Sequence, residues 1–257
     1  MANRGREMLE AMIAACPLPV TVRNRYGGDC EILLSYGAGH EGRRPWVLEH
    51  IRRGRRFIGV DLGYWDRPAP DAGMRITLDG DHCAKFLRPE PAHRWDSRGV
   101  ALRDDAKADG IIMIVGQGIK SRRIAGGAGL EWLNSIADRV RAAYPGVPIA
   151  YRRKRPSDPM PRRVLPVPEI PIEEALKTAR MVVCQHSNVA VDACIAGVPA
   201  VCTAGAASRL YGSDLCNPIN PTPAQRLEFL RSLAWWNWRP SEAREVWTYL
   251  LERVRSG

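Results

Sequence analysis

The sequence is constrained most by residues 180–202, which read RMVVCQHSNVAVDACIAGVPAVC. Residues 181–184 form a short apolar run rich in β-branched side chains, the pattern of a buried strand. Polar residues 185–188 interrupt it, and the small residues at 189–196 have the length of a short helix. A second apolar run at 199–202 predicts another strand. The stretch therefore indicates one strand–helix–strand unit.

The ends of this helix carry recognisable capping residues. Ser187 or Asn188 is a natural N-cap, and Gly197 stands where a C-terminal glycine is expected. A strand that leads into a capped helix presents free backbone N–H groups and the positive end of the helix dipole. The turn is thus a candidate phosphate site; the alternative is a structural unit of an ordinary α/β domain with no ligand.

Similar alternation of strands and helices extends over the chain. In the second half, strands are expected at 111–115 and 148–151 and helices at 130–144 and 172–179, which implies a parallel sheet covered on both faces. The first half has strands at 31–36, 55–62 and 74–78 and helices at 4–15 and 46–53. Helices are also expected at 223–236 and 242–254, where a tryptophan cluster predicts anchoring to a core or domain interface.

The expected domains are 1–104 and 105–222, followed by C-terminal helices over 223–257. A proline-rich basic segment, residues 152–168, holds five prolines and six basic residues and is expected to lack regular structure. We call it the basic loop. Residues 90–101 are expected to be a loop with at most a short helix.

Composition narrows the class of protein. The 257 residues contain no apolar run of the ~20 residues that cross a bilayer, and acidic residues in the N-terminal segment argue against a signal peptide. Seven cysteines without CxxC spacing fit a reducing cytoplasm and core packing rather than a zinc or redox site. The net charge of +10 favours a polyanionic partner such as nucleic acid or an anionic membrane surface. The alternative is the arginine bias of a GC-rich genome.

The second half gathers cations and donors where its strands end. If the strand ends meet at one edge of the sheet, they form a surface suited to a diphosphate. The candidate ligand-binding residues are Gln117, Gly118, Lys120, Ser121, Arg152, Lys154, His186, Ser187, Asn188 and Asp192. Asp192 lies one helical turn after Asn188; it is either a hydroxyl acceptor or a structural acid of the first turn.

Candidate acids and bases lie in the first half. Asp61 ends a buried strand, where a carboxylate with a raised pKa can act as a base; the alternative is a turn-capping acid. His82 follows Asp81, but neighbours on a strand point to opposite faces, which weakens an imidazole–carboxylate pair. Residues 37–40, GAGH, form a glycine-rich turn where a ligand can approach the backbone.

Residues 186–201, HSNVAVDACIAGVPAV, resemble the carboxyl-domain motif of two-domain, GT-B-type glycosyltransferases. Several further segments are similar to a group of phage-encoded proteins of this fold: SYGAGHEGRRPW, VDLGYWDR, LDGDH, YRRK and LAWWNW. The resemblance implies two Rossmann-like domains facing across a cleft, with C-terminal helices that cross back to the first domain. The chain is shorter than the better-known DNA glucosyltransferases.

The same resemblance implies a sugar transfer. The second domain would bind a nucleotide-sugar donor such as a UDP-sugar, without a metal, and the first would bind the acceptor. Asp61 or His82 would be the base, and the acceptor-binding residues would be Gly37, Gly39, His40, Arg43, Arg44, Tyr64 and Trp65. Phage enzymes of this type often modify hydroxymethylated DNA bases, and the net charge suits double-stranded DNA as the acceptor. The target base would have to be flipped out of the duplex. The expected location is the cytoplasm of the host cell.

Three other functions stay open on sequence grounds. The acceptor can be a surface polysaccharide or a lipid-linked sugar, with the basic loop facing anionic lipid. The protein can be a non-catalytic DNA-binding protein on the same scaffold. A sugar-nucleotide epimerase is compatible with the same fold, because fold does not fix function.

Overall fold

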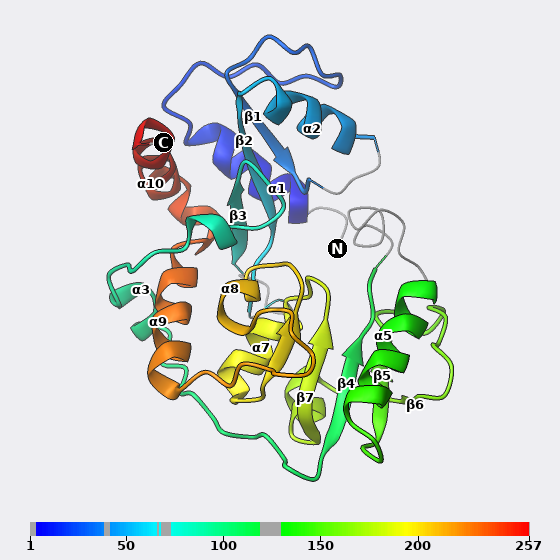
Figure 1. Ribbon diagram of the computed structural model, residues 1–257. Helices are drawn as coiled ribbons and strands as arrows, with labels where there is room; N and C mark the ends of the chain where they lie inside the picture. The colour runs from blue at the N-terminus through cyan, green and yellow to red at the C-terminus, as the bar shows by residue number, and fades with distance from the viewer. Residues whose placement is uncertain (1–3, 39–41, 66, 68–72, 119–129, 257) are drawn as a thin grey trace. The chain divides into compact units, whose positions relative to one another are not determined.

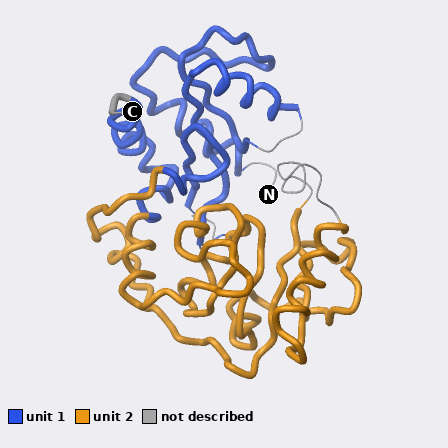
Figure 2. The backbone as a smooth tube through the Cα atoms, viewed as in Figure 1, with its two compact units in different colours: residues 1–85, 233–257 blue, residues 86–232 orange. Residues whose placement is uncertain are grey.

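The computed structural model describes residues 4–38, 42–65, 67, 73–118 and 130–256. The chain divides into two compact units, of which unit 1 contains residues 1–85 and 233–257 and unit 2 contains residues 86–232 (Figure 2). The domain limits expected at residues 104 and 222 stay a prediction. The C-terminal helix α10, Ala243–Ser256, belongs to unit 1, so the chain returns to its first unit.

Unit 1 is built on a mixed four-stranded sheet in the order β1-β2-β3-β9. Strands β1, Ile32–Tyr36, and β2, Arg56–Leu62, are parallel and are joined through α2, Arg44–Arg52 (Figure 1). The antiparallel strand β3, Met74–Leu78, pairs with β2 and with the two-residue strand β9, Asn237–Trp238. The first three strands confirm the predicted positions, whereas β9 was not predicted, because a two-residue pairing leaves no periodic signal.

The tryptophan cluster anchors the C-terminal segment within unit 1. Trp247 Nε1 donates to the carbonyl oxygen of Met12 at 2.7 Å, which ties α10 to α1, Arg4–Ala14. Trp235 stacks on Tyr249 with ring centroids 5.3 Å apart, and Trp236 is fully buried. This confirms the expectation that these rings anchor helices onto a core. A 3-10 turn, Pro240–Glu242, precedes α10.

Unit 2 contains a five-stranded parallel sheet in the order β6-β5-β4-β7-β8. Its strands are β4 Ile111–Val115, β5 Ile149–Arg152, β6 Leu165–Pro166, β7 Ala179–Cys184 and β8 Ala200–Cys202. Its helices are α3 His93–Asp96, α5 Leu130–Ala143, α6 Ile172–Leu176, α7 Val189–Ala196, α8 Ser208–Tyr211 and α9 Pro223–Ala234, the last of which extends two residues into unit 1. A 3-10 turn at Ala84–Phe86 spans the boundary between the two units.

Two of these elements correct the sequence analysis. The basic loop was expected to have no regular structure, but β6 lies inside it and pairs with β5. Pro166 is tolerated there because β6 is an edge strand that has no neighbour on its other side among the described strands. The short helix α8 follows β8 in a segment that was predicted only as a turn.

The core of unit 2 follows from the alternation of side chains along its strands. One face of the sheet packs against the apolar face of α5 in a buried cluster that includes Ile112, Ile114, Tyr151 and Val183. On the other side, α7 contacts both β7 and β8 and packs against α6. The predicted core cysteines of this region, Cys184, Cys194 and Cys202, are all buried.

Helix α7 begins and ends where the sequence predicted. It spans Val189–Ala196, and Gly197 adopts a left-handed conformation with φ of 73°. The last carbonyls of the helix are satisfied by a neighbouring segment: Arg103 N–H donates to Ile195 O at 2.9 Å, and Asp105 N–H donates to Ala196 O at 2.7 Å. Helix α7 is therefore held firmly at its carboxyl end.

None of the helices in the described part of the chain combines the length and the apolar character that a bilayer span requires.

Candidate functional site

The carboxyl ends of β4, β5 and β7 meet at one edge of the parallel sheet in unit 2. Gly116 N–H, after β4, donates to the carbonyl oxygen of Arg152 at 2.8 Å. The side-chain amides of Gln117 and Gln185 form a hydrogen bond that joins the ends of β4 and β7. In open parallel sheets ligands bind outside these strand ends, so this edge is the candidate site.

The backbone at Gly118 lies close to the side chain of Lys154. A Cβ atom built at Gly118 would stand 3.0 Å from Lys154 Cδ and 3.2 Å from its Nζ. A larger residue at position 118 would therefore displace the lysine. The structure thus brings together Gln117, Gly118, Arg152 and Lys154, which the sequence had grouped as candidate ligand-binding residues.

Arg152 is only partly satisfied by protein atoms. Its Nη2 donates to the carbonyl oxygen of Ile170 at 2.7 Å, whereas its Nη1 is buried and has no hydrogen-bond partner among the described residues. Burial lowers the pKa of Arg152, and the nearby charges of Glu173 and Asp192 oppose that shift. A buried guanidinium nitrogen without a partner is costly unless a ligand supplies an acceptor.

Gln117 carries the complementary unsatisfied atom. Its side chain is 8% exposed, and its Oε1 is buried without a hydrogen-bond partner in the described part of the chain. The site therefore offers one buried donor, on Arg152, and one buried acceptor, on Gln117.

The turn between β7 and α7 adds backbone donors to this edge. Asn188 is the N-cap residue of α7, and its side chain makes no capping bond. Ser187, one residue earlier, accepts a hydrogen bond from Val189 N–H at its Oγ, at 3.2 Å. Asp192 is buried in the first turn of α7, and its N–H donates to the carbonyl oxygen of Asn188 at 3.2 Å. The negative charge of Asp192 lies near Arg152 and opposes the lowering of the Arg152 pKa.

A loop that the sequence analysis did not assign to the site also contacts this turn. Ala204 N–H donates to Gln185 O at 2.7 Å. A Cβ atom at Gly205, where φ is 95°, would lie 3.0 Å from the Cα atom of His186. The loop after β8 thus packs against the backbone of His186. In the sequence, only the glycine of this Gly/Ala/Ser stretch pointed to such a close approach of two backbones.

Four predicted site residues lie outside the described residues. Lys120 and Ser121 follow β4 in the sequence, and Gly39 and His40 follow β1.

The predicted base Asp61 forms part of a charged cluster in unit 1. Its Oδ2 lies 2.8 Å from Arg75 Nη2, and its Oδ1 accepts from Leu62 N–H at 2.8 Å. Burial, followed by the charge and hydrogen bond of Asp61, raises the pKa of Tyr36 to about 12. The backbone at Gly37, where φ is 65°, approaches the same carboxylate: a Cβ atom there would lie 3.8 Å from Asp61 Oδ2.

A second ion pair occupies the turn after β3. Arg44 Nη1 lies 2.9 Å from Asp81 Oδ1, and Arg43 Nη1 donates to the carbonyl oxygen of Tyr36 at 3.1 Å. Asp81 is therefore engaged by Arg44, while the neighbouring His82 is partly buried.

Two predicted acceptor-binding residues belong to the core. Tyr64 is fully buried, with its hydroxyl 3.2 Å from Cys83 Sγ, and burial raises its pKa. Trp65 is also buried. Both rings contribute to the packing of unit 1.

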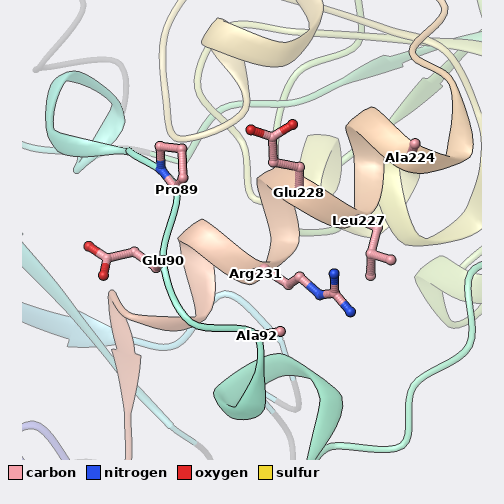
Figure 3. A pocket seen from close by; sticks show the side chains of 7 residues that line it. All are labelled: Pro89, Glu90, Ala92, Ala224, Leu227, Glu228 and Arg231. Atoms are coloured by element: carbon pink, nitrogen blue, oxygen red, sulfur yellow. The ribbon is translucent and has the colours of Figure 1, made fainter.

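A separate hollow of about 280 Å³ lies along α9, and none of the predicted ligand-binding residues that the structure describes lines it (Figure 3). Figure 3 shows Leu227, Glu228 and Arg231 projecting from α9, with Glu90 on the extended segment beside it. Arg231 forms an ion pair with Asp96 at 3.0 Å.

Among the described residues, no group of three or more His, Cys, Asp or Glu side chains is arranged to hold a metal ion.

Comparison with known proteins identifies the fold. No protein-family model and no curated protein sequence matches the chain. Two solved structures from Thermosulfurimonas dismutans match almost all of it. KpsC, beta Kdo 2,4 transferase, has a TM-score of 0.59 at 13% identity and covers 97% of this chain and 95% of its own. KpsC, beta Kdo 2,7 transferase, has a TM-score of 0.57 at 16% identity, with 96% and 95% covered.

A third structure, the glycosyltransferase SnogD from Streptomyces nogalater, matches with a TM-score of 0.26 at 18% identity, over 81% of this chain and 62% of its own. The two KpsC matches define the class: the chain has the two-domain, Rossmann-like GT-B type of fold.

Proposed function

We propose that the protein is a glycosyltransferase that takes a sugar from a nucleotide-sugar donor bound at the strand-end site of unit 2. The observation that carries the proposal is the pair of buried, unsatisfied atoms at this edge, Arg152 Nη1 and Gln117 Oε1, which have no partners among the described residues. A ligand with both acceptor oxygens and N–H donors, as a nucleotide has, would satisfy both atoms.

The charge at this edge suits the departing group. Arg152 and Lys154 supply positive charge, and the amino end of α7 adds the helix dipole beside Ser187 and Asn188. Negative charge grows on the leaving nucleotide in the transition state, so fixed cations and N–H groups at that position would lower the barrier. Lys120 and Ser121 remain candidates for the same role.

A thermal-shift titration with a panel of nucleoside mono- and diphosphates tests the donor site. Binding should raise the melting temperature according to ligand concentration and affinity. Arg152→Met and the double variant Ser187→Ala/Asn188→Ala should weaken binding, whereas Arg244→Met, at an exposed arginine of unit 1, should not. Unchanged affinity in both site variants would contradict the assignment.

Asp61 or His82 would serve as the base that accepts the proton of the acceptor hydroxyl. Asp61 is supported by its position beside the open backbone at Gly37 and by the ion pair with Arg75 that orients it. Asp61→Asn and His82→Gln should each leave donor binding intact. Only the variant of the true base should lower kcat strongly, by roughly 10²–10⁴-fold.

Two acceptors are candidates. The KpsC structures that share the fold are named as Kdo transferases, which favours a surface polysaccharide or a lipid-linked sugar. The net charge of +10 favours a hydroxymethylated base in double-stranded DNA. Mass spectrometry of modified DNA and of glycan acceptors, each incubated with a panel of nucleotide sugars, distinguishes them. Donor binding without a mass shift on DNA would exclude the DNA acceptor.

A further inference from the structure

The basic loop of unit 2 exposes more positive than negative charge. Five cations are exposed, namely Arg153, Lys154, Arg155, Arg162 and Arg163. Within residues 152–170 the acids are Asp158, which is buried with its Oδ2 accepting from Arg155 N–H at 2.9 Å, and Glu169, which is exposed beside Ile170. The exposed cations of this segment thus outnumber its exposed acids by five to one.

This loop is held in a defined conformation. Asp158 N–H returns a bond to Arg155 O at 3.0 Å. On the other side, Arg162 N–H donates to Asn134 Oδ1 at 2.8 Å, and Arg141 Nη2 donates to Arg163 O at 2.9 Å, which fastens the loop to α5. Preorganised cations lose little conformational entropy when they meet a charged surface.

Two exposed aliphatic side chains accompany these cations. Leu165, on the edge strand β6, is 58% exposed, and Ile170, just after the loop, is 36% exposed. The chain of Ile170 is tied to the candidate site through the bond from Arg152 to its carbonyl oxygen. Exposed aliphatic groups among cations match an interface that is both anionic and apolar.

We propose that the basic loop, with Leu165 and Ile170, is a docking surface for an anionic lipid membrane. Residues 153–170 contain no aromatic residue on which bases could stack, and a phosphate backbone offers no apolar partner to Leu165 and Ile170, which favours a membrane over nucleic acid. An anionic bilayer offers phosphate charge to the arginines and an acyl boundary to Leu165 and Ile170. This proposal does not depend on the identity of the nucleotide or of the acceptor.

Co-sedimentation of the full chain with phosphatidylcholine vesicles, with and without phosphatidylglycerol, tests the surface. Binding should require phosphatidylglycerol and weaken with salt. Arg162→Glu/Arg163→Glu should lower the partition coefficient on the order of tenfold or more, because each cation near an anionic surface contributes roughly a fivefold factor. The matched control Arg25→Glu/Arg244→Glu changes the net charge equally at exposed arginines of unit 1 and should have a much smaller effect.

Leu165→Ser separates the apolar contribution, since it should reduce the binding that persists at high salt. Circular dichroism and the nucleotide thermal shift verify that each variant is folded. Equal losses in the two double variants would overturn the proposal in favour of diffuse charge. Tight binding to duplex DNA without binding to phosphatidylglycerol vesicles in the same buffer would overturn it in favour of nucleic acid.

Discussion

The charged residues at the strand ends of the two units differ in how they are paired. In unit 1 the acids near the strand ends are paired with arginines: Asp61 with Arg75, and Asp81 with Arg44. In unit 2, Arg152 forms no ion pair with any described residue and keeps a buried nitrogen without a hydrogen-bond partner.

Under the proposed function, the ion pairs of unit 1 hold their side chains in place, and Arg152 binds the ligand. An ion pair whose partners satisfy each other contributes to the fold, and removing one partner leaves an uncompensated charge. Arg152 is partly buried, with Glu173 and Asp192 nearby but no ion pair to a described residue, so removing it should cost less to folding than to binding. The predictions below test that distinction, beginning with the largest expected effect.

The turn at the start of α7 belongs to the candidate site, so a firmly held α7 is needed to keep that site in place. Gly197→Ala should destabilise the protein by about 3 kcal/mol or more, because the residue is left-handed and its Cβ would lie within 2.3 Å of Arg103 O. Gly146→Ala is the matched control: its φ is 78°, but nothing lies within 4 Å, so it should cost about 1 kcal/mol. Urea denaturation measures both, and equal losses would show that α7 yields at that end.

Removing one arginine from each unit compares them directly. Arg75→Met should lower the free energy of unfolding by about 2 kcal/mol, since it leaves Asp61 without its partner. Arg152→Met should leave stability almost unchanged while weakening nucleotide binding about tenfold or more. Melting temperatures with and without nucleotide report both effects, and the opposite ranking would refute the distinction between the units.

The charged cluster of unit 1 predicts a pH dependence. The pKa of Tyr36 is raised from its ordinary value of 10.0 to about 12, so the folded state retains the proton where the unfolded chain loses it. Its contribution is therefore complete below pH 10 and is lost between about pH 10 and 12. Because the side chain is only half-buried, about 1 kcal/mol is expected. Tyr36→Phe should have a flatter stability profile over that range; an unchanged slope would exclude this titration.

The smallest effect concerns the cap of α7. Ser187→Ala removes the acceptor of Val189 N–H and should cost about 1 kcal/mol or less. Thermal denaturation of Ser187→Ala and Ser187→Thr measures this contribution, because threonine retains the hydroxyl acceptor. Equal losses in the two variants would show that the Ser187 hydroxyl does not support the start of α7.

Most secondary structure was predictable because it depends on local patterns. The apolar run at 111–115 and the capped helix at 189–196 are found at the predicted residues. By contrast, β6 and β9 are two-residue strands that leave no periodic pattern, and β9 pairs with a strand far away in the sequence. In unit 1 the sequence also could not reveal that β3 runs antiparallel to β2, since direction is set by the connection and not by composition.

The candidate site was predictable only in part. The sequence by itself determined the βαβ unit at 180–202 and the kinds of side chains that follow its strands, because capping and periodicity act within a few residues. Only the tertiary structure decided that Asp61 meets Arg75 and that Arg152 Nη1 is buried without a hydrogen-bond partner among the described residues. Such pairings depend on which strand ends become neighbours, and that is fixed by packing between residues far apart in the chain.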